Sequence, residues 1–245
     1  MAEILPQPVQ LPEKVPLDFE LVRGWIEVEV RDPEGRTVQK GRHEMRSFVN
    51  NFLRVFEGLF KSVGLPLGSY GTTNATVVKQ DGSSATIYTE YYNSRTSTGG
   101  TSGGGTPMGA LAADNVDTYG IVVGSGTSPV NLNTYALSSK IAHGTGSGQL
   151  DYDAVTVEAL GLDTSVSPPV YRIRILRSFK NLSGGSISIA EVGLIARSYW
   201  AYYYTTEGVD NDVVYLIARD VLPTTYVVPN GGSATVAIVV EVTLG

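Results

Sequence analysis

The second half of the chain consists of short runs in which apolar and polar residues alternate, separated by clusters of turn-forming residues. In residues 170–176, for example, two arginines alternate with Tyr171, Ile173 and Ile175. A period of two is typical of antiparallel strands with one buried and one solvated face. The sequence therefore predicts a mainly β fold, an antiparallel β-sandwich of Ig-like or jelly-roll-like type. Its expected strands are Tyr119–Val123, Tyr152–Leu160, Val170–Leu176, Ser186–Ile195, Val213–Arg219 and Ala234–Leu244.

One amphipathic helix is predicted over Ser47–Lys61, after a β-hairpin in residues 24–40 that turns at Asp32–Gly35. We expect the apolar stripe to pack on the chain's own sheet, because a face this apolar needs a partner surface. The stripe consists of Phe48, Val49, Phe52, Leu53, Val55, Phe56, Leu59 and Phe60. The opposite, polar face consists of Asn50, Asn51, Arg54, Glu57 and Lys61.

The N-terminal residues favour an extended arm, because prolines interrupt them at short intervals. These prolines are Pro6, Pro8, Pro12 and Pro16. Seven apolar residues lie among them, which favours an arm that clasps a neighbouring subunit over a disordered tail.

Four regions are expected along the chain: an arm over 1–23, a hairpin with the helix over 24–63, loops with a second hairpin over 64–118, and a sandwich core over 119–245. The second and fourth regions are expected to form one compact domain. The third is rich in Gly, Ser and Thr, and its hairpin is predicted to turn at Asp81-Gly82.

Composition excludes several classes of protein. The 245 residues are 42% hydrophobic and 17% charged, which excludes a coiled coil and a histone-like basic protein. The net charge of −6 argues against a nucleic-acid surface. Cysteine is absent, which removes disulfides and thiol catalysis. No apolar run is long enough for a membrane span, and the N-terminus has no secretory signal pattern.

The sequence predicts a protein that is not an enzyme and that holds no cofactor. The two histidines, His43 and His143, lie among surface-type residues, and no G-x-S-x-G elbow is present. The glycine-rich pieces complete neither a phosphate-binding nor a dinucleotide-binding motif. A hydrolase is therefore the weakest alternative.

Two acidic pairs are weak candidates for Ca²⁺ ligands, because hard cations prefer several oxygen ligands. They are Asp151 with Asp153, and Asp210 with Asp212. Neither pair completes an EF-hand pattern, so ordinary turn chemistry is the preferred interpretation and no metal is predicted.

The most unusual local composition is an aromatic run, which predicts a subunit contact, with core packing and a sugar-binding platform as alternatives. The run contains Tyr199, Trp200, Tyr202, Tyr203 and Tyr204. The full set of predicted interface residues adds Pro6, Pro8 and Pro12 of the arm and Phe48, Phe52 and Phe56 of the helix.

Motifs in a fixed order occupy the last 125 residues. They are Gly120–Pro129 leading to Asn133–Leu137, an Arg- and aromatic-rich strand at Tyr171–Phe179, a Gly-Gly turn at Ser183–Gly185, Ile189–Leu194 with the letters EVGL, Leu216–Leu222, and Val228–Val236. With the early helix, this order resembles virion proteins of tailed bacteriophages and related archaeal viruses.

The resemblance implies a non-enzymatic structural protein that self-assembles into a symmetric oligomer, in the tail or as a decoration on the head exterior. Its implied partners are itself and other virion proteins, with a host surface glycan as a further possibility and neither nucleic acid nor membrane. Its implied location is the virion, assembled in the host cytoplasm. Glu191 of EVGL is expected to be partly buried and hydrogen-bonded. A carbohydrate-binding adhesin that uses Tyr199–Tyr204 and an extracellular filament subunit remain alternatives.

Overall fold

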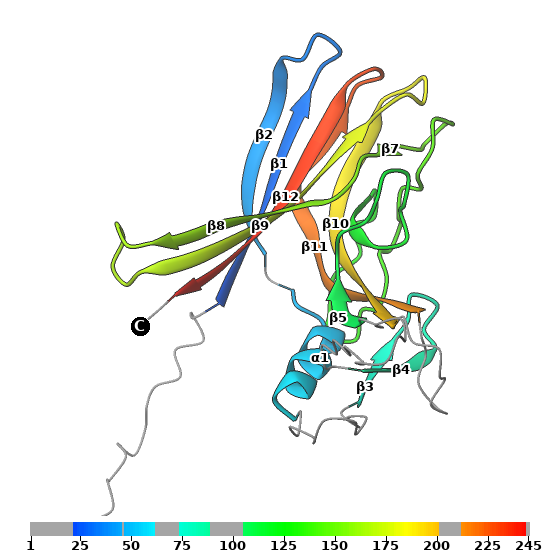
Figure 1. Ribbon diagram of the computed structural model, residues 1–245. Helices are drawn as coiled ribbons and strands as arrows, with labels where there is room; N and C mark the ends of the chain where they lie inside the picture. Colours follow the sequence, from blue (N-terminus) through cyan, green and yellow to red (C-terminus); the bar gives the residue numbers. More distant parts are fainter. Residues whose placement is uncertain (1–21, 46, 62–73, 89–104, 201–211, 244–245) are drawn as a thin grey trace, which may run out of the picture.

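The computed structural model describes residues 22–45, 47–61, 74–88, 105–200 and 212–243. These residues form a mainly β structure of antiparallel sheets with a single helix, which confirms the predicted fold class (Figure 1). The residues predicted to form the arm lie outside the described part up to position 21, and strand β1 begins at Val22.

Sheet A joins the two ends of the described chain. Its strand order is β2 (Thr37–Met45), β1 (Val22–Arg31), β12 (Ser233–Thr243) and β9 (Val170–Lys180). Two strands share the far edge of β9: β7 (Asp151–Tyr152) and β8 (Thr156–Asp163). The register places Ile26, Ile238 and Ile175 side by side across three strands, so the apolar alternation of each strand falls on one common face.

Sheet B is built around β10 (Ile187–Trp200), which pairs along one edge with β11 (Asp212–Val228). Its other edge is shared by β6 (Gly120–Gly124) and β5 (Gly105–Gly109). The sequence analysis did not predict β5, because the stretch Gly-Thr-Pro-Met-Gly carries no apolar alternation.

The core lies between the two sheets. Val28, Val236 and Phe179 of sheet A and Ile189 and Leu194 of sheet B belong to the same buried cluster. Both sheets contribute alternate residues to this layer, as expected for a sandwich.

The predicted strand Tyr152–Leu160 is interrupted. Asp153 still bonds to β9 through its backbone N–H, but the next two N–H groups turn away. Ala154 N donates to the Asp114 carboxylate, and Val155 N donates to the Ala112 carbonyl oxygen. The segment around residues 112–114 therefore competes with β9 for these donors, and the ladder resumes only at β8.

Helix α1 (Asn50–Lys61) packs on β11 and on the hairpin of β3 (Asn74–Val78) and β4 (Ser84–Tyr88). It begins later than predicted, because Phe48 forms a β-bridge with Ala218. Val49 and Val55 are buried as expected, whereas Leu53 and Phe56 are half-exposed.

The placement of Asn51 on the polar face of the helix was wrong. Its side chain is buried and accepts from Val78 N, while its amide donates to the carbonyl oxygens of Val78 and Leu216. These bonds tie the helix to β3 and β11. Hydrophobic periodicity describes each element by itself and does not predict such a connection.

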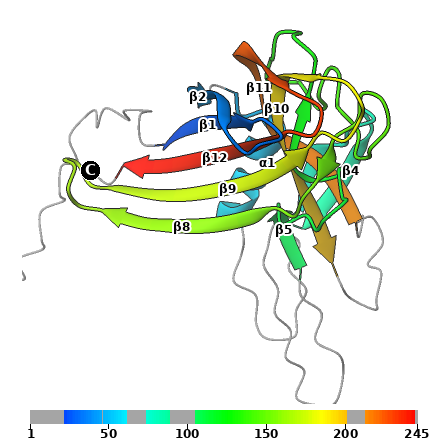
Figure 2. The ribbon, with the colours of Figure 1, turned by 90° about the horizontal axis from the view of Figure 1, so that it is seen from above.

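Sheet A runs past the end of sheet B on one side (Figures 1 and 2). We call this projecting part the wing; it consists of β8, residues 170–176 of β9, residues 237–243 of β12 and residues 22–27 of β1.

Candidate interaction surface

A buried ion pair connects three of the sequence motifs. Glu191 of the EVGL strand is 0% exposed and accepts from Arg219 Nε of β11 at 2.6 Å. The same carboxylate accepts backbone N–H groups from Gly126, Ser138 and Ser139 at 2.7–3.2 Å. Arg219 also donates to the Ser128 carbonyl oxygen. The pair therefore fastens the long loop after β6 onto sheet B, and Glu191 is buried more deeply than the expected partial burial.

The glycines around Glu191 are required by space. A Cβ on Gly126 would lie 1.8 Å from Ser138 Oγ and 2.5 Å from Glu191 Oε1. On Gly193 it would lie 2.4 Å from Leu137 Cδ1. The glycines of the motifs thus make room for the carboxylate and for the loop that covers it.

Asn181 connects two turns in the same way. It is fully buried, and its amide donates to the carbonyl oxygens of Gly185 and Val228. Its backbone bonds to both Gly231 and Gly232. The Gly-Gly turn and the turn at 229–232 are therefore held against each other at the end of the sandwich.

Arg177 is fully buried between the sheets, although no carboxylate of the described residues forms an ion pair with it. Its guanidinium stacks on the Tyr152 ring at 4.7 Å and donates to five backbone carbonyl oxygens. The acceptors belong to Ala113, Val116, Tyr119, Ile121 and Asp153. Burial lowers the pKa of Arg177. The side chain organises the irregular segment 113–119 and the start of β6, which hydrophobic periodicity does not predict.

These buried polar groups are bonded within the fold, so interactions with other molecules would involve the surface. The two faces of the wing differ sharply.

One face of the wing is ionic. Arg172 binds Glu241 at 2.6 Å and Asp163 at 2.8 Å. Arg174 lies 3.3 Å from Glu158 and 3.6 Å from Glu27. The Ser165 hydroxyl, together with Arg172, lowers the pKa of Asp163 to about 2. The charges on this face therefore neutralise one another across four strands.

The other face of the wing is apolar. Ile175 and Val240 still pack against the core, but Tyr171, Val157 and Leu162 are 37%, 46% and 54% exposed. We call this surface the apolar wing face; it consists of Val157, Ala159, Leu162, Tyr171, Ile173, Ile175, Val240 and Val242. Contiguous apolar surface of this kind is typical of an interaction site.

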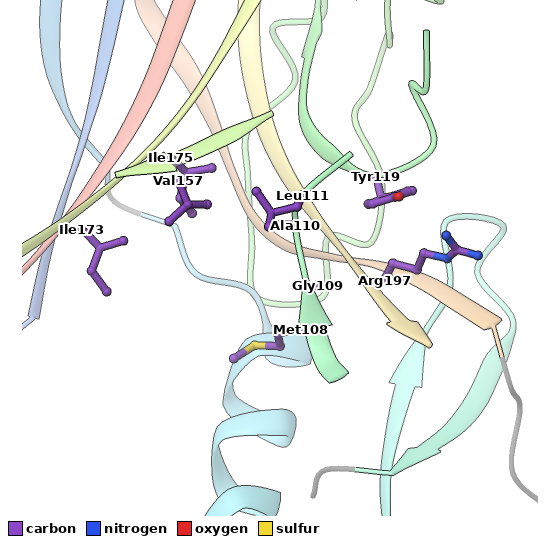
Figure 3. A pocket seen from close by; sticks show the side chains of 9 residues that line it. All are labelled: Met108, Gly109, Ala110, Leu111, Tyr119, Val157, Ile173, Ile175 and Arg197. Carbon is purple, nitrogen blue, oxygen red and sulfur yellow. The ribbon is translucent and has the colours of Figure 1, made fainter. Parts of the chain in front are cut away.

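A groove of about 530 Å³ opens where the apolar wing face meets β5 and β10 (Figure 3). Val157 and Ile175 lie together on one side, and Tyr119 and Arg197 lie on the other. Arg197 donates two hydrogen bonds to the Asp212 carboxylate, and this contact lowers the pKa of Asp212. The guanidinium therefore brings no unpaired charge into the groove. The remaining lining residues are Met108, Gly109, Ala110, Leu111 and Ile173.

The predicted interface residues fall in different places. Phe48 and Phe52 are partly buried and stack at 4.4 Å between ring centroids, and Phe56 continues the stack at 5.8 Å with about half of its surface exposed. Tyr199 and Trp200 end strand β10. Pro6, Pro8, Pro12, Tyr202, Tyr203 and Tyr204 lie outside the described residues.

The described candidate metal ligands contact basic side chains instead. Asp153 binds Lys180 at 2.7 Å, Asp212 binds Arg197, and Asp151 lies 3.6 Å from His143. Asp210 lies outside the described residues. In the described ranges, no group of three or more His, Cys, Asp or Glu side chains is placed to hold a metal ion.

The two histidines contact different parts of the fold, and neither lines the groove. His43 Nε2 contacts the Tyr226 hydroxyl at 2.5 Å, and His143 Nδ1 accepts from Tyr152 N at 3.3 Å. Within the described part of the chain, no helix has the length and apolar character needed to cross a membrane.

A scan against models of protein families, a search of curated proteins and a search of solved structures each find no match for this chain. The functional interpretation therefore depends on the contacts described above and on the ordered motifs.

Proposed function

We propose that this chain is a non-enzymatic structural subunit of a virus particle and that it self-assembles through the apolar wing face. The observation that supports this most directly is the contrast between the two sides of the wing. The ionic face is neutralised within the chain, whereas the apolar face keeps Val157, Leu162 and Tyr171 exposed. Covering apolar surface is the main driving force of protein association.

The buried polar contacts support a structural role. Glu191, Arg219 and Arg177 are ionisable groups inside the fold, and each is buried with partners from the chain itself. Activity as a general acid or base needs a group that can reach a substrate. Here these groups hold loops in place.

The resemblance to virion proteins gains support from the way its motifs meet. The segments Gly120–Pro129, Ile189–Leu194 and Leu216–Leu222 come together at Glu191 and Arg219, and those at 183–185 and 228–236 meet at Asn181. Segments that contact one another in this way form one structural unit. Such a unit is compatible with a protein of the tail or of the head exterior.

The proposal is tested with Val157→Lys, a charge placed on the edge strand of the apolar wing face, beside the groove. Val38→Lys is the matched control, because Val38 is a valine of similar exposure, 51% against 46%, on the opposite edge strand β2. Light scattering of the unmodified chain should give a discrete multiple of the single-chain mass. Val157→Lys should shift this mass toward a monomer, whereas Val38→Lys should leave it unchanged.

Negative-stain images of the same samples should show closed rings, trimers or tubes. Antibodies raised against the chain should label virus particles purified from a culture that carries its gene. A chain that stays monomeric at high concentration would contradict the self-assembly, and labelling confined to the cell surface would contradict the virion location.

A further inference from the structure

We propose that the apolar wing face is the seat for residues 4–12 of a second copy of this chain. This inference rests on the proposed function and deepens it, because it names the occupant of the surface through which the chains would assemble.

The chemistry of the two surfaces matches. Residues 4–12 read Ile-Leu-Pro-Gln-Pro-Val-Gln-Leu-Pro and carry no charge, although charged residues flank them at Glu3 and Glu13. The described lining of the groove is mostly apolar and includes the ring of Tyr119; its one charged member, Arg197, is already bound to Asp212. An uncharged apolar segment can enter such a groove without leaving a buried charge unpaired.

The prolines define how the segment would lie. Pro6, Pro8 and Pro12 have no backbone N–H, so this segment is a poor partner for a continuous strand ladder. It is suited to an extended polyproline-type conformation, which docks into apolar grooves at a small entropic cost. Nine residues in this conformation span about 28 Å. This is close to the roughly 23 Å covered by the seven wing residues 170–176 of β9.

The point of attachment favours a second copy over the same chain. Val22 pairs with Val242, which pairs with Tyr171, so β1 begins at the outer end of the wing. Strand β1 runs inward from there, so the described chain begins at the tip of the wing. On its own wing, residues 4–12 would have to double back over the strand that follows them, whereas the wing of a neighbouring copy can be reached without such a reversal.

The linker is long enough for the exchange. The nine residues 13–21 connect the proposed docking segment to Val22, and they can span up to about 30 Å. A segment and its seat on one chain then serve different neighbours, a head-to-tail arrangement that forms a closed ring when the rotation between neighbours closes.

Cross-linking tests the contact directly, because the chain contains no cysteine of its own. A Val9→Cys chain with a mass tag is co-expressed with an untagged Val157→Cys chain and oxidised. Each chain then carries one cysteine, so a disulfide of mixed mass can form only between two copies. The control pairs Val9→Cys with Val38→Cys, whose site has similar exposure but lies on β2. We expect the mixed disulfide with Val157→Cys and not with Val38→Cys.

A second measurement separates this inference from the proposed function. Deletion of residues 1–12 should reduce the native mass to that of a single chain. An oligomer that survives the deletion and gives no mixed disulfide would overturn the inference and leave self-assembly standing. A full-length chain that is itself monomeric would overturn both. A monomer of the double variant Val9→Cys/Val157→Cys with an internal disulfide would show that the arm covers its own wing.

Discussion

At the scale of single residues, this protein uses side chains with several hydrogen-bond donors or acceptors to organise loops that have little regular structure. Arg177 donates to five carbonyl oxygens, and the Glu191 carboxylate accepts three backbone N–H groups and a guanidinium. Buried groups of this kind are costly unless they are paired, so each one specifies the position of its partners. The irregular stretches 113–119 and 125–139 are therefore fixed by side chains that belong to the strands.

Gly126 offers a direct test of the Glu191 centre. In Gly126→Ala the new methyl group would meet Ser138 Oγ and Glu191 Oε1, and the backbone N–H that binds Glu191 would move. We expect a loss of about 2–3 kcal/mol in the free energy of unfolding, measured by urea denaturation. Gly185→Ala is the control, since nothing lies within 4 Å of its Cβ position and its φ is not positive. Equal losses in the two variants would contradict a tightly packed centre at Glu191.

At the scale of elements, the positions of the strands were predicted more accurately than the pairing between them. Alternation located β9, β10, β11 and β12, because their inward residues face one continuous core. It missed β5, whose five residues have no period, and it joined β7 to β8. Side-chain periodicity does not reveal that a backbone N–H bonds to a loop distant in sequence, as Val155 N does to the Ala112 carbonyl oxygen.

Less of the candidate site than of the fold could be predicted from the sequence. The alternation at Tyr171, Ile173 and Ile175 predicts an apolar face but not what lies opposite it. Only the structure shows that sheet A continues past sheet B, so that the inner end of this face is core and the outer end is surface. The helix illustrates the same limit, since Asn51 is buried because of its specific bonds to Val78 and Leu216.

The contact between β2 and β11 predicts a dependence of stability on pH. Burial lowers the pKa of His43, whose Nε2 contacts the Tyr226 hydroxyl. The folded state therefore favours neutral His43, while the unfolded state takes up a proton near its ordinary pKa of about 6.5. Stability from this group is complete above about pH 6.5 and is lost as the pH falls through the lowered pKa of the folded state.

Urea denaturation at pH 7.5 and pH 5 measures this effect. The unmodified chain should be less stable at the lower pH, and His43→Gln should reduce that difference. Tyr226→Phe keeps the ring that buries His43 and should retain the difference. If His43→Gln shows the same pH dependence as the unmodified chain, the titrating group lies elsewhere.

At the scale of the whole molecule, the two faces of the wing differ in the interactions that they make. Its ionic face is satisfied within the chain, and its apolar face is available to a neighbour. Raising NaCl from 0.1 M to 1 M shortens the screening length from about 10 Å to about 3 Å and weakens contacts between exposed charges. Assembly through apolar surface should therefore persist. Light scattering at both concentrations checks this, and dissociation in high salt would point to a charged contact instead.

The pairing of β1 with β12 also has a consequence for synthesis. Residues 22–31 find their partners at 233–242, at the opposite end of the described chain. While a ribosome is still making the chain, sheet A is missing its central strand, because β12 lies between β1 and β9. The wing cannot form until that last strand has emerged, since pairings so distant in sequence close late in folding. A truncated chain would therefore lack the apolar wing face, and only chains translated through β12 could present it.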